Sequence, residues 1–209
     1  MNTFLFDFDG TLVDSMPTFI SVMLRILDEN NIKYDKDIVK IITPLGYKGT
    51  AEYYKTLGVS LSVEEMMQKM TAYAKKEYEE NILAKNNVKK VLTLLKERGA
   101  SLHVLTASPH SMLDPCLKRL GLYDLFSNVW SCDDFKTTKS DPDIYKSAAK
   151  RIGKAVGEIV FLDDNLNALK TAKSAGMRIY GVYDASSEEY ADEIMKISEK
   201  YILDFKALL

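Results

Sequence analysis

From residue 87 to the end of the chain, patterns typical of helices alternate with short apolar runs typical of buried strands. Such alternation predicts a parallel sheet covered by helices on both faces, which is a doubly wound α/β fold. An additional edge strand is predicted at 201–205. The expected strands are 101–106, 128–132, 158–162 and 177–183, and the expected helices are 87–98, 110–120, 141–152, 165–175 and 187–200.

The segment before this alternation is different. Only residues 3–6 form a strand-like apolar run, and positions 16–84 show helical spacing without a strand. The longest helix, 62–84, is predicted to open with a capping box formed by Ser62 and Glu65. The other expected helices are one of about four turns after Pro17, then 35–43 and 48–57, the last two joined by a turn at 44–47. Residues 1–15 and 85–209 are therefore predicted to form the α/β core, and residues 16–84 an inserted helical domain.

Two acidic residues follow the first strand directly. Asp7 and Asp9 are two positions apart, so an extended chain projects both side chains to one side, and Gly10 allows a sharp turn after them. Open α/β sheets bind ligands outside the carboxyl ends of their strands. The pair is thus a candidate site, although an isolated Asp-x-Asp can also serve only to cap a loop.

Three further polar features lie at the ends of later strands or in the loops that follow them. Thr106 ends strand 101–106, Lys139 stands in the loop before helix 141–152, and Asp163 and Asp164 follow strand 158–162. Alone, each has an ordinary structural explanation, such as a strand-ending threonine or a surface acid. Their common place in the fold favours a single site built from all of them.

These positions resemble the four motifs of the haloacid dehalogenase superfamily. The run from Phe6 to Ser15, Phe-Asp-Phe-Asp-Gly-Thr-Leu-Val-Asp-Ser, is similar to the first motif. Thr106, Lys139 and the Asp163-Asp164 pair are similar to the second, third and fourth, with Ser140 where a proline commonly follows the lysine. The resemblance covers essentially the whole chain. It implies a Rossmann-like core with a small helical cap, in the subgroup of phosphoglycolate phosphatases and β-phosphoglucomutases.

The resemblance also implies a magnesium-dependent phosphatase acting on a small phosphate monoester through an aspartyl-phosphate. Asp7 would be the nucleophile and Asp9 the general acid/base. Hard oxygen ligands independently favour Mg²⁺. Asp164 would coordinate the metal directly, and Asp163 directly or through water. The implied metal ligands are Asp7, Asp9 (through its backbone carbonyl), Asp163 and Asp164, and the implied phosphate-binding residues are Gly10, Thr106, Ala107 and Lys139.

Other functions remain open at this stage. A phosphomutase of the β-phosphoglucomutase type would carry a histidine in the first cap helix and an arginine in the cap loop, but this chain has Phe19 at the first place and no arginine in 43–50. A catalytically dead protein and a phosphoacceptor signalling domain are weaker alternatives, the latter because its acids come in another order. Lys48 and His110 are candidates for substrate contact, against an ordinary surface role for Lys48 and a surface or helix-start role for His110.

Composition limits the partners. The formal net charge of −2 gives no general attraction to nucleic acid or to an anionic membrane. The resemblance implies a small phosphate ester as the partner, and a monomer or weak homodimer is expected. Cys116 and Cys132 have neither zinc-site nor disulfide-framework spacing. Because the N-terminal apolar run is broken by acids, a signal peptide is not expected, and the predicted location is the cytoplasm.

Overall fold

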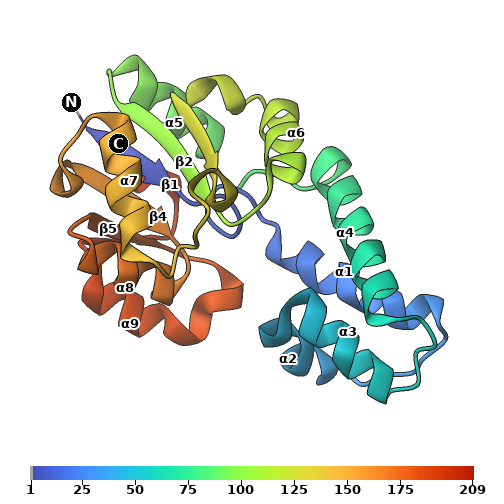
Figure 1. Ribbon diagram of the computed structural model, residues 1–209. Helices are drawn as coiled ribbons and strands as arrows, with labels where there is room; N and C mark the ends of the chain where they lie inside the picture. The colour runs from blue at the N-terminus through green and yellow to red at the C-terminus, as the bar shows by residue number, and fades with distance from the viewer. Residues whose placement is uncertain (1) are drawn as a thin grey trace. The chain divides into compact units, whose positions relative to one another are not determined.

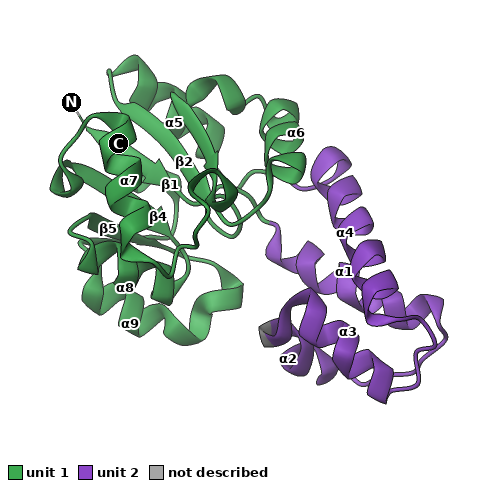
Figure 2. Ribbon diagram, in the orientation of Figure 1, with its two compact units in different colours: residues 1–14, 83–209 green, residues 15–82 purple. Residues whose placement is uncertain are grey.

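Figure 1 shows the computed structural model of the protein, which describes residues 2–209 except for the side chain of Pro44. The chain divides into two compact units (Figure 2). One contains the residues up to Asp14 and those from Leu83 to Leu209, and the other runs from Ser15 to Ile82. The first is an α/β unit and the second is helical.

Across residues 2–209, the strands form one six-stranded parallel sheet in the order β3-β2-β1-β4-β5-β6. This confirms the predicted doubly wound α/β fold. β1 lies between β2 and β4, so the chain leaves the sheet centre first to one side and later to the other. The strands are β1 (Thr3–Phe6), β2 (Ser101–Thr106), β3 (Asn128–Ser131), β4 (Ile159–Asp163), β5 (Arg178–Val182) and β6 (Lys200–Ile202).

Helices cover both faces of this sheet. Successive residues of a strand point to opposite faces, so each strand contributes side chains to the packing on both sides. Leu5 and Phe161 belong to a buried cluster with α7, α8 and α9, whereas Phe6 faces the other side, where its ring stacks 6.4 Å from Phe205. Both faces of β1 are therefore buried, which explains its uninterrupted apolar run. The helices of this unit are α5 (Val88–Glu97), α6 (His110–Leu120), α7 (Pro142–Ile152), α8 (Leu166–Ser174) and α9 (Ala191–Ile197).

The predicted helix at 187–200 is wrong at both ends. A 3-10 helix occupies Ala185–Tyr190, α9 stops at Ile197, and β6 begins at Lys200. The reason is sheet pairing: the Glu199 backbone N–H already donates to the Ile179 carbonyl of β5, so this backbone must be extended. The expected edge strand exists but is shorter and earlier than 201–205.

The helical unit contains the expected helices, but the connection between two of them differs from the prediction. The capping box of Ser62 and Glu65 is present, with bonds of 2.7 and 3.1 Å. The turn predicted at 44–47 is instead the 3-10 helix Thr43–Leu45, and α3 begins directly at Gly46. No helix in the described part of the chain is long and apolar enough to cross a membrane. The helices of this unit are α1 (Met16–Glu29), α2 (Ile38–Ile42), α3 (Gly46–Thr56) and α4 (Val63–Glu80).

Candidate active site

The carboxyl ends of β1 and β4 bring three buried acids together. Asp7 follows β1, and its backbone N–H donates to the Leu162 carbonyl of β4 at 2.8 Å. Asp163 ends β4 and Asp164 comes next. One carboxylate oxygen from each of the three lies within 4.8 Å of the others. This place is the switch point of the sheet, where connections leave in opposite directions and α/β proteins bind their ligands.

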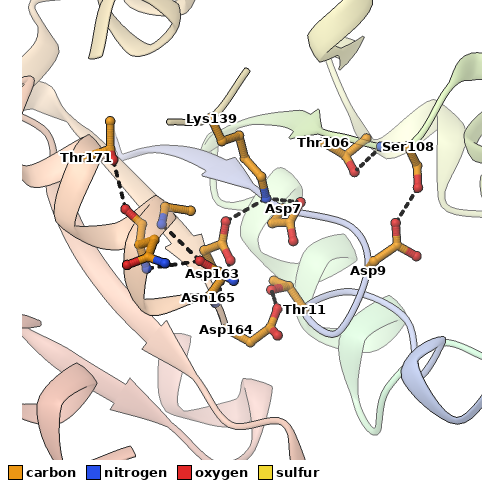
Figure 3. A network of polar contacts seen from close by, with 12 residues as sticks. Asp7, Asp9, Thr11, Thr106, Ser108, Lys139, Asp163, Asp164, Asn165 and Thr171 are labelled. Atoms are coloured by element: carbon orange, nitrogen blue, oxygen red, sulfur yellow. Dashed lines mark hydrogen bonds and ion pairs between the residues drawn. The ribbon is translucent and has the colours of Figure 1, made fainter. Parts of the chain in front are cut away.

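Lys139 inserts a positive charge among these acids. Its ammonium is 2.7 Å from Asp7 Oδ1 and 2.8 Å from Asp163 Oδ2, as Figure 3 shows. Only 15% of the lysine side chain is exposed, and Asp163 is fully buried. The Tyr145 hydroxyl of α7 donates to the Lys139 carbonyl at 3.0 Å and so fixes the backbone that carries the charge. A lysine from a loop more than twenty residues before Asp163 in the chain thereby completes the cluster.

The turn after Asp9 packs against the same acids. Gly10 has φ +71°, and a Cβ built there would lie 2.6 Å from Asp164 Oδ2, so both the conformation and the space require glycine. The next residue, Thr11, donates its hydroxyl to Asp164 Oδ1 at 3.0 Å. Sequence reasoning missed Thr11, although its place inside the first motif, directly after the turn glycine, was an available signal.

The pKa values reflect excess negative charge. Burial, and next the charge of Asp163, raise the pKa of Asp7 despite the opposing effect of Lys139. The same two causes raise the pKa of Asp164 to about 7. Burial lowers the pKa of Lys139, but Asp163 and Asp7 outweigh it and the net direction is upward. The ammonium therefore stays charged, while ionising both Asp7 and Asp164 is unfavourable without a further cation.

A divalent cation fits this arrangement. When the three carboxyls are ionised, they carry two more negative charges than the single ammonium compensates among these four side chains. All of the available donors are hard oxygens, and they come from a few carboxylates, which is the donor set that Mg²⁺ prefers.

A family model for haloacid dehalogenase-like hydrolases matches residues 4–182. The chain belongs to this family. The predicted resemblance, and with it an enzyme of the hydrolase class, is confirmed. A "putative phosphatase YhcW" of Bacillus subtilis is 28% identical over 83% of this chain and 80% of its own. A "phosphorylated carbohydrates phosphatase" of Thermotoga maritima is 27% identical over 87% and 85%.

A solved structure described as a putative beta-phosphoglucomutase from Thermotoga maritima has the same fold. It superposes with a TM-score of 0.83 over 97% of this chain and 94% of its own, at 23% identity. Likeness at this level of identity concerns the fold of the hydrolase and does not identify its substrate.

The second predicted motif of this hydrolase lies at the end of β2. Thr106 is buried, and its hydroxyl oxygen accepts from the Ser108 backbone N–H at 3.1 Å. Ala107 between them is exposed. The Ser108 hydroxyl donates to Asp9 Oδ2 at 2.5 Å, a contact that the motif resemblance did not point to. The Asp9 side chain is not part of the acid cluster found among the described residues.

The two weakest candidates have other partners. His110 is bonded at Nδ1 to Asp114 (2.9 Å) and at Nε2 to Asp134 (2.8 Å), so both ring nitrogens are engaged by carboxylates. Lys48 belongs to the helical unit, where it is exposed and lies 4.0 Å from Glu52. A role for either in substrate contact stays a prediction.

Proposed function

We propose that this hydrolase is a magnesium-dependent phosphatase that cleaves a small phosphate monoester through an aspartyl-phosphate on Asp7. The observation that carries the proposal is the buried Asp7 carboxylate at the end of β1, paired with the Lys139 ammonium and adjacent to two further acids. The phosphatases named among the relatives support the same reaction class.

In the first half of the reaction, an Asp7 carboxylate oxygen attacks phosphorus in line. The bond from phosphorus to the ester oxygen breaks, and Asp9 gives its proton to the leaving alkoxide. Lys139 neutralises charge on the phosphoryl oxygens, and the Thr106 hydroxyl and the Ala107 backbone N–H donate hydrogen bonds to them. The Gly10 backbone N–H already donates to the Val13 carbonyl at 3.0 Å, so it is not among these donors. The product alcohol departs and the phosphoryl group remains on Asp7.

In the second half, Asp9 is ionised because it has given up its proton. It takes a proton from a water molecule that attacks the aspartyl-phosphate, the bond from phosphorus to Asp7 breaks, and inorganic phosphate forms. Asp9 is then protonated and ready for the next substrate, so the cycle is balanced in protons and atoms.

Asp7, Asp164 and the backbone carbonyl of Asp9 are the proposed magnesium ligands. Bound Mg²⁺ would offset the charge of the phosphate, which otherwise repels a carboxylate nucleophile. Asp163 has both oxygens engaged, one by Lys139 at 2.8 Å and one by the Asn165 backbone N–H at 2.7 Å. This supports an indirect or water-mediated role for Asp163 and a direct one for Asp164.

Water is the proposed acceptor of the phosphoryl group. Phe19 occupies the cap position where a phosphomutase would carry histidine, and its ring stacks on Tyr47 with centroids 5.1 Å apart. A phenylalanine has no hydrogen-bond donor with which to hold a sugar hydroxyl.

A panel of small phosphate monoesters, offered with magnesium and with chelator, tests the proposal. We expect phosphate release from at least one ester, lost in chelator and restored by added Mg²⁺. The panel should contain β-glucose 1-phosphate with catalytic glucose 1,6-bisphosphate, for which no glucose 6-phosphate is expected. Full activity in excess chelator would exclude the metal mechanism, and efficient glucose 6-phosphate formation would make the enzyme a mutase.

The remaining proposals concern the binding partner, the oligomeric state and the cellular compartment. A small phosphate ester is the partner that the proposed reaction requires, and the proposed assembly is a monomer or weak homodimer. The two cysteines are free and buried, which supports, but does not test, a reducing compartment such as the cytoplasm.

A further inference from the structure

The Asp9 carboxylate is held by a residue from another strand end. Ser108, in the loop between β2 and α6, donates its hydroxyl to Asp9 Oδ2 at 2.5 Å. Figure 3 shows the two side chains directed at one another, on the opposite side of Asp7 from Asp163 and Asp164. Asp9 is thus oriented by a contact that is separate from the acid cluster.

The backbone that presents this hydroxyl is fixed on both sides. Before it, the Ser108 N–H is bonded to Thr106 Oγ1 at 3.1 Å. After it, Pro109 has its φ restricted by its ring and stands as the N-cap of α6. His110 in the first turn of α6 is bridged to Asp114 and Asp134. The serine hydroxyl is therefore placed before substrate arrives.

The same turn also orients Thr106. Because Thr106 Oγ1 accepts the Ser108 N–H, the hydroxyl hydrogen of Thr106 is directed elsewhere and is available to a phosphoryl oxygen. One turn of three residues thus sets a phosphate contact and the orientation of Asp9 together.

We propose that Ser108 is the positioning residue for Asp9, an inference that rests on the acid/base role given to Asp9 in the proposed function. The hydroxyl binds Oδ2 and so fixes the orientation of the carboxyl group that transfers the proton. A carboxyl group that carries its proton on one oxygen still accepts at the other, so the Ser108 contact is compatible with both halves of the reaction. Asp9 then gives and takes its proton from one fixed orientation.

The leaving group provides a test, because only a basic leaving group needs the proton of Asp9 during departure. An alkyl phosphate that the wild type hydrolyses leaves as a basic alkoxide, whereas p-nitrophenyl phosphate leaves as a weakly basic phenolate. The measured quantity is kcat/KM with saturating magnesium, which covers the steps up to loss of the alcohol. Asp9→Asn shows how far kcat/KM falls when the general acid is lost completely.

For Ser108→Ala, we expect kcat/KM on the alkyl phosphate to fall on the order of 10-fold, since misplacing a general acid forfeits part of its 10²–10⁴-fold contribution. The fall should be carried by kcat, and the loss on p-nitrophenyl phosphate should stay within about 3-fold by the same reasoning. Ser108→Thr, which keeps the hydroxyl, should recover most of the rate. Ser111→Ala, which removes an exposed hydroxyl from the nearby first turn of α6, is the matched control and should behave as wild type.

Equal losses on both substrates, or no loss, would overturn the positioning role. Thermal melting of each variant checks folding, and if Ser108→Ala does not fold, Ser108→Cys, with similar volume and only a weak donor, takes its place in the comparison. The proposed function fails separately: full alkyl phosphatase activity in Asp9→Asn would remove the acid/base assignment. An inactive Asp9→Asn beside an unaffected Ser108→Ala would refute only the role of Ser108.

Discussion

Replacing Lys139 by methionine tests how much its positive charge stabilises the buried acids of this site. The substitution keeps much of the side-chain volume and removes the charge that lies 2.7 Å from Asp7 and 2.8 Å from Asp163. At these separations each pair has a gross attraction of about 6 kcal/mol for an effective dielectric constant near 20. Much of that attraction is spent on desolvating the groups, and a carboxyl can take up a proton once the lysine is gone. The expected net loss is the ~3–5 kcal/mol typical of breaking a buried pair on one side only.

The assay is urea unfolding at neutral pH in the presence of chelator. Lys136→Met is the matched control, because Lys136 is an exposed lysine three positions earlier in the chain and surface charges contribute ~0–1 kcal/mol. Magnesium should stabilise Lys139→Met against unfolding, since a cation bound by the acids offsets part of the missing charge. If Lys139→Met loses no more stability than Lys136→Met in chelator, the buried ion cluster does not have the energetic role given to it here.

Three further outcomes are expected. Asp7→Asn should reduce phosphate release at least about 10³-fold, because an amide is a poor nucleophile, and near-wild-type turnover would end the aspartyl-phosphate mechanism. Gly10→Ala should lose ~1–2 kcal/mol from its positive φ and, because its Cβ would lie 2.6 Å from Asp164 Oδ2, should also weaken Mg²⁺ binding in calorimetry; unchanged affinity would contradict this. Asp114, and also Asp134, raise the pKa of His110 against the opposing effect of burial, so its contribution to stability is complete below its unfolded pKa of about 6.5 and disappears as pH rises through the folded value. Because the imidazole is 38% exposed, His110→Ala should cost only ~1 kcal/mol or less at pH 6 and less at pH 9, as measured by urea unfolding, and a cost that grows with pH would refute the ion-pair reading.

The sequence could predict the sheet and its acidic edge because both depend on local patterns. β1 and β4 are buried on both faces; Asp7 follows β1 directly, and β4 ends in Asp163 with Asp164 next, so each strand and its candidate ligand appear together in the printed chain. Parallel pairing then brings these strand ends to one edge, with Phe6 of β1 in register with Leu162 of β4. Any acid that follows such strands must lie near the others.

The contacts that orient the site could not be predicted in the same way. Thr11 and Asp164 are 153 positions apart, and Ser108 and Asp9 are 99 apart. Neither spacing has a local pattern, since each contact depends on how two loops approach after the strands have paired. The end of α9 could not be predicted either, because it too depends on a contact between distant parts of the chain. Helical spacing continues to residue 200 in the sequence, but hydrogen bonding to β5 sets the boundary.

The adjacent acids at the end of β4 show how one dipeptide serves two purposes. Asp163 and Asp164 both reach the cluster with Asp7, but each has its own hydrogen-bond partners. Asp163 has Lys139 on one oxygen and the Asn165 backbone on the other, and these bonds hold the charge of the lysine beside Asp7. Asp164 is confined by Thr11 and by the missing side chain of Gly10, and burial raises its pKa toward neutrality. The first acid therefore stabilises the cluster as it stands, whereas the second would be ionised more readily once a cation is bound.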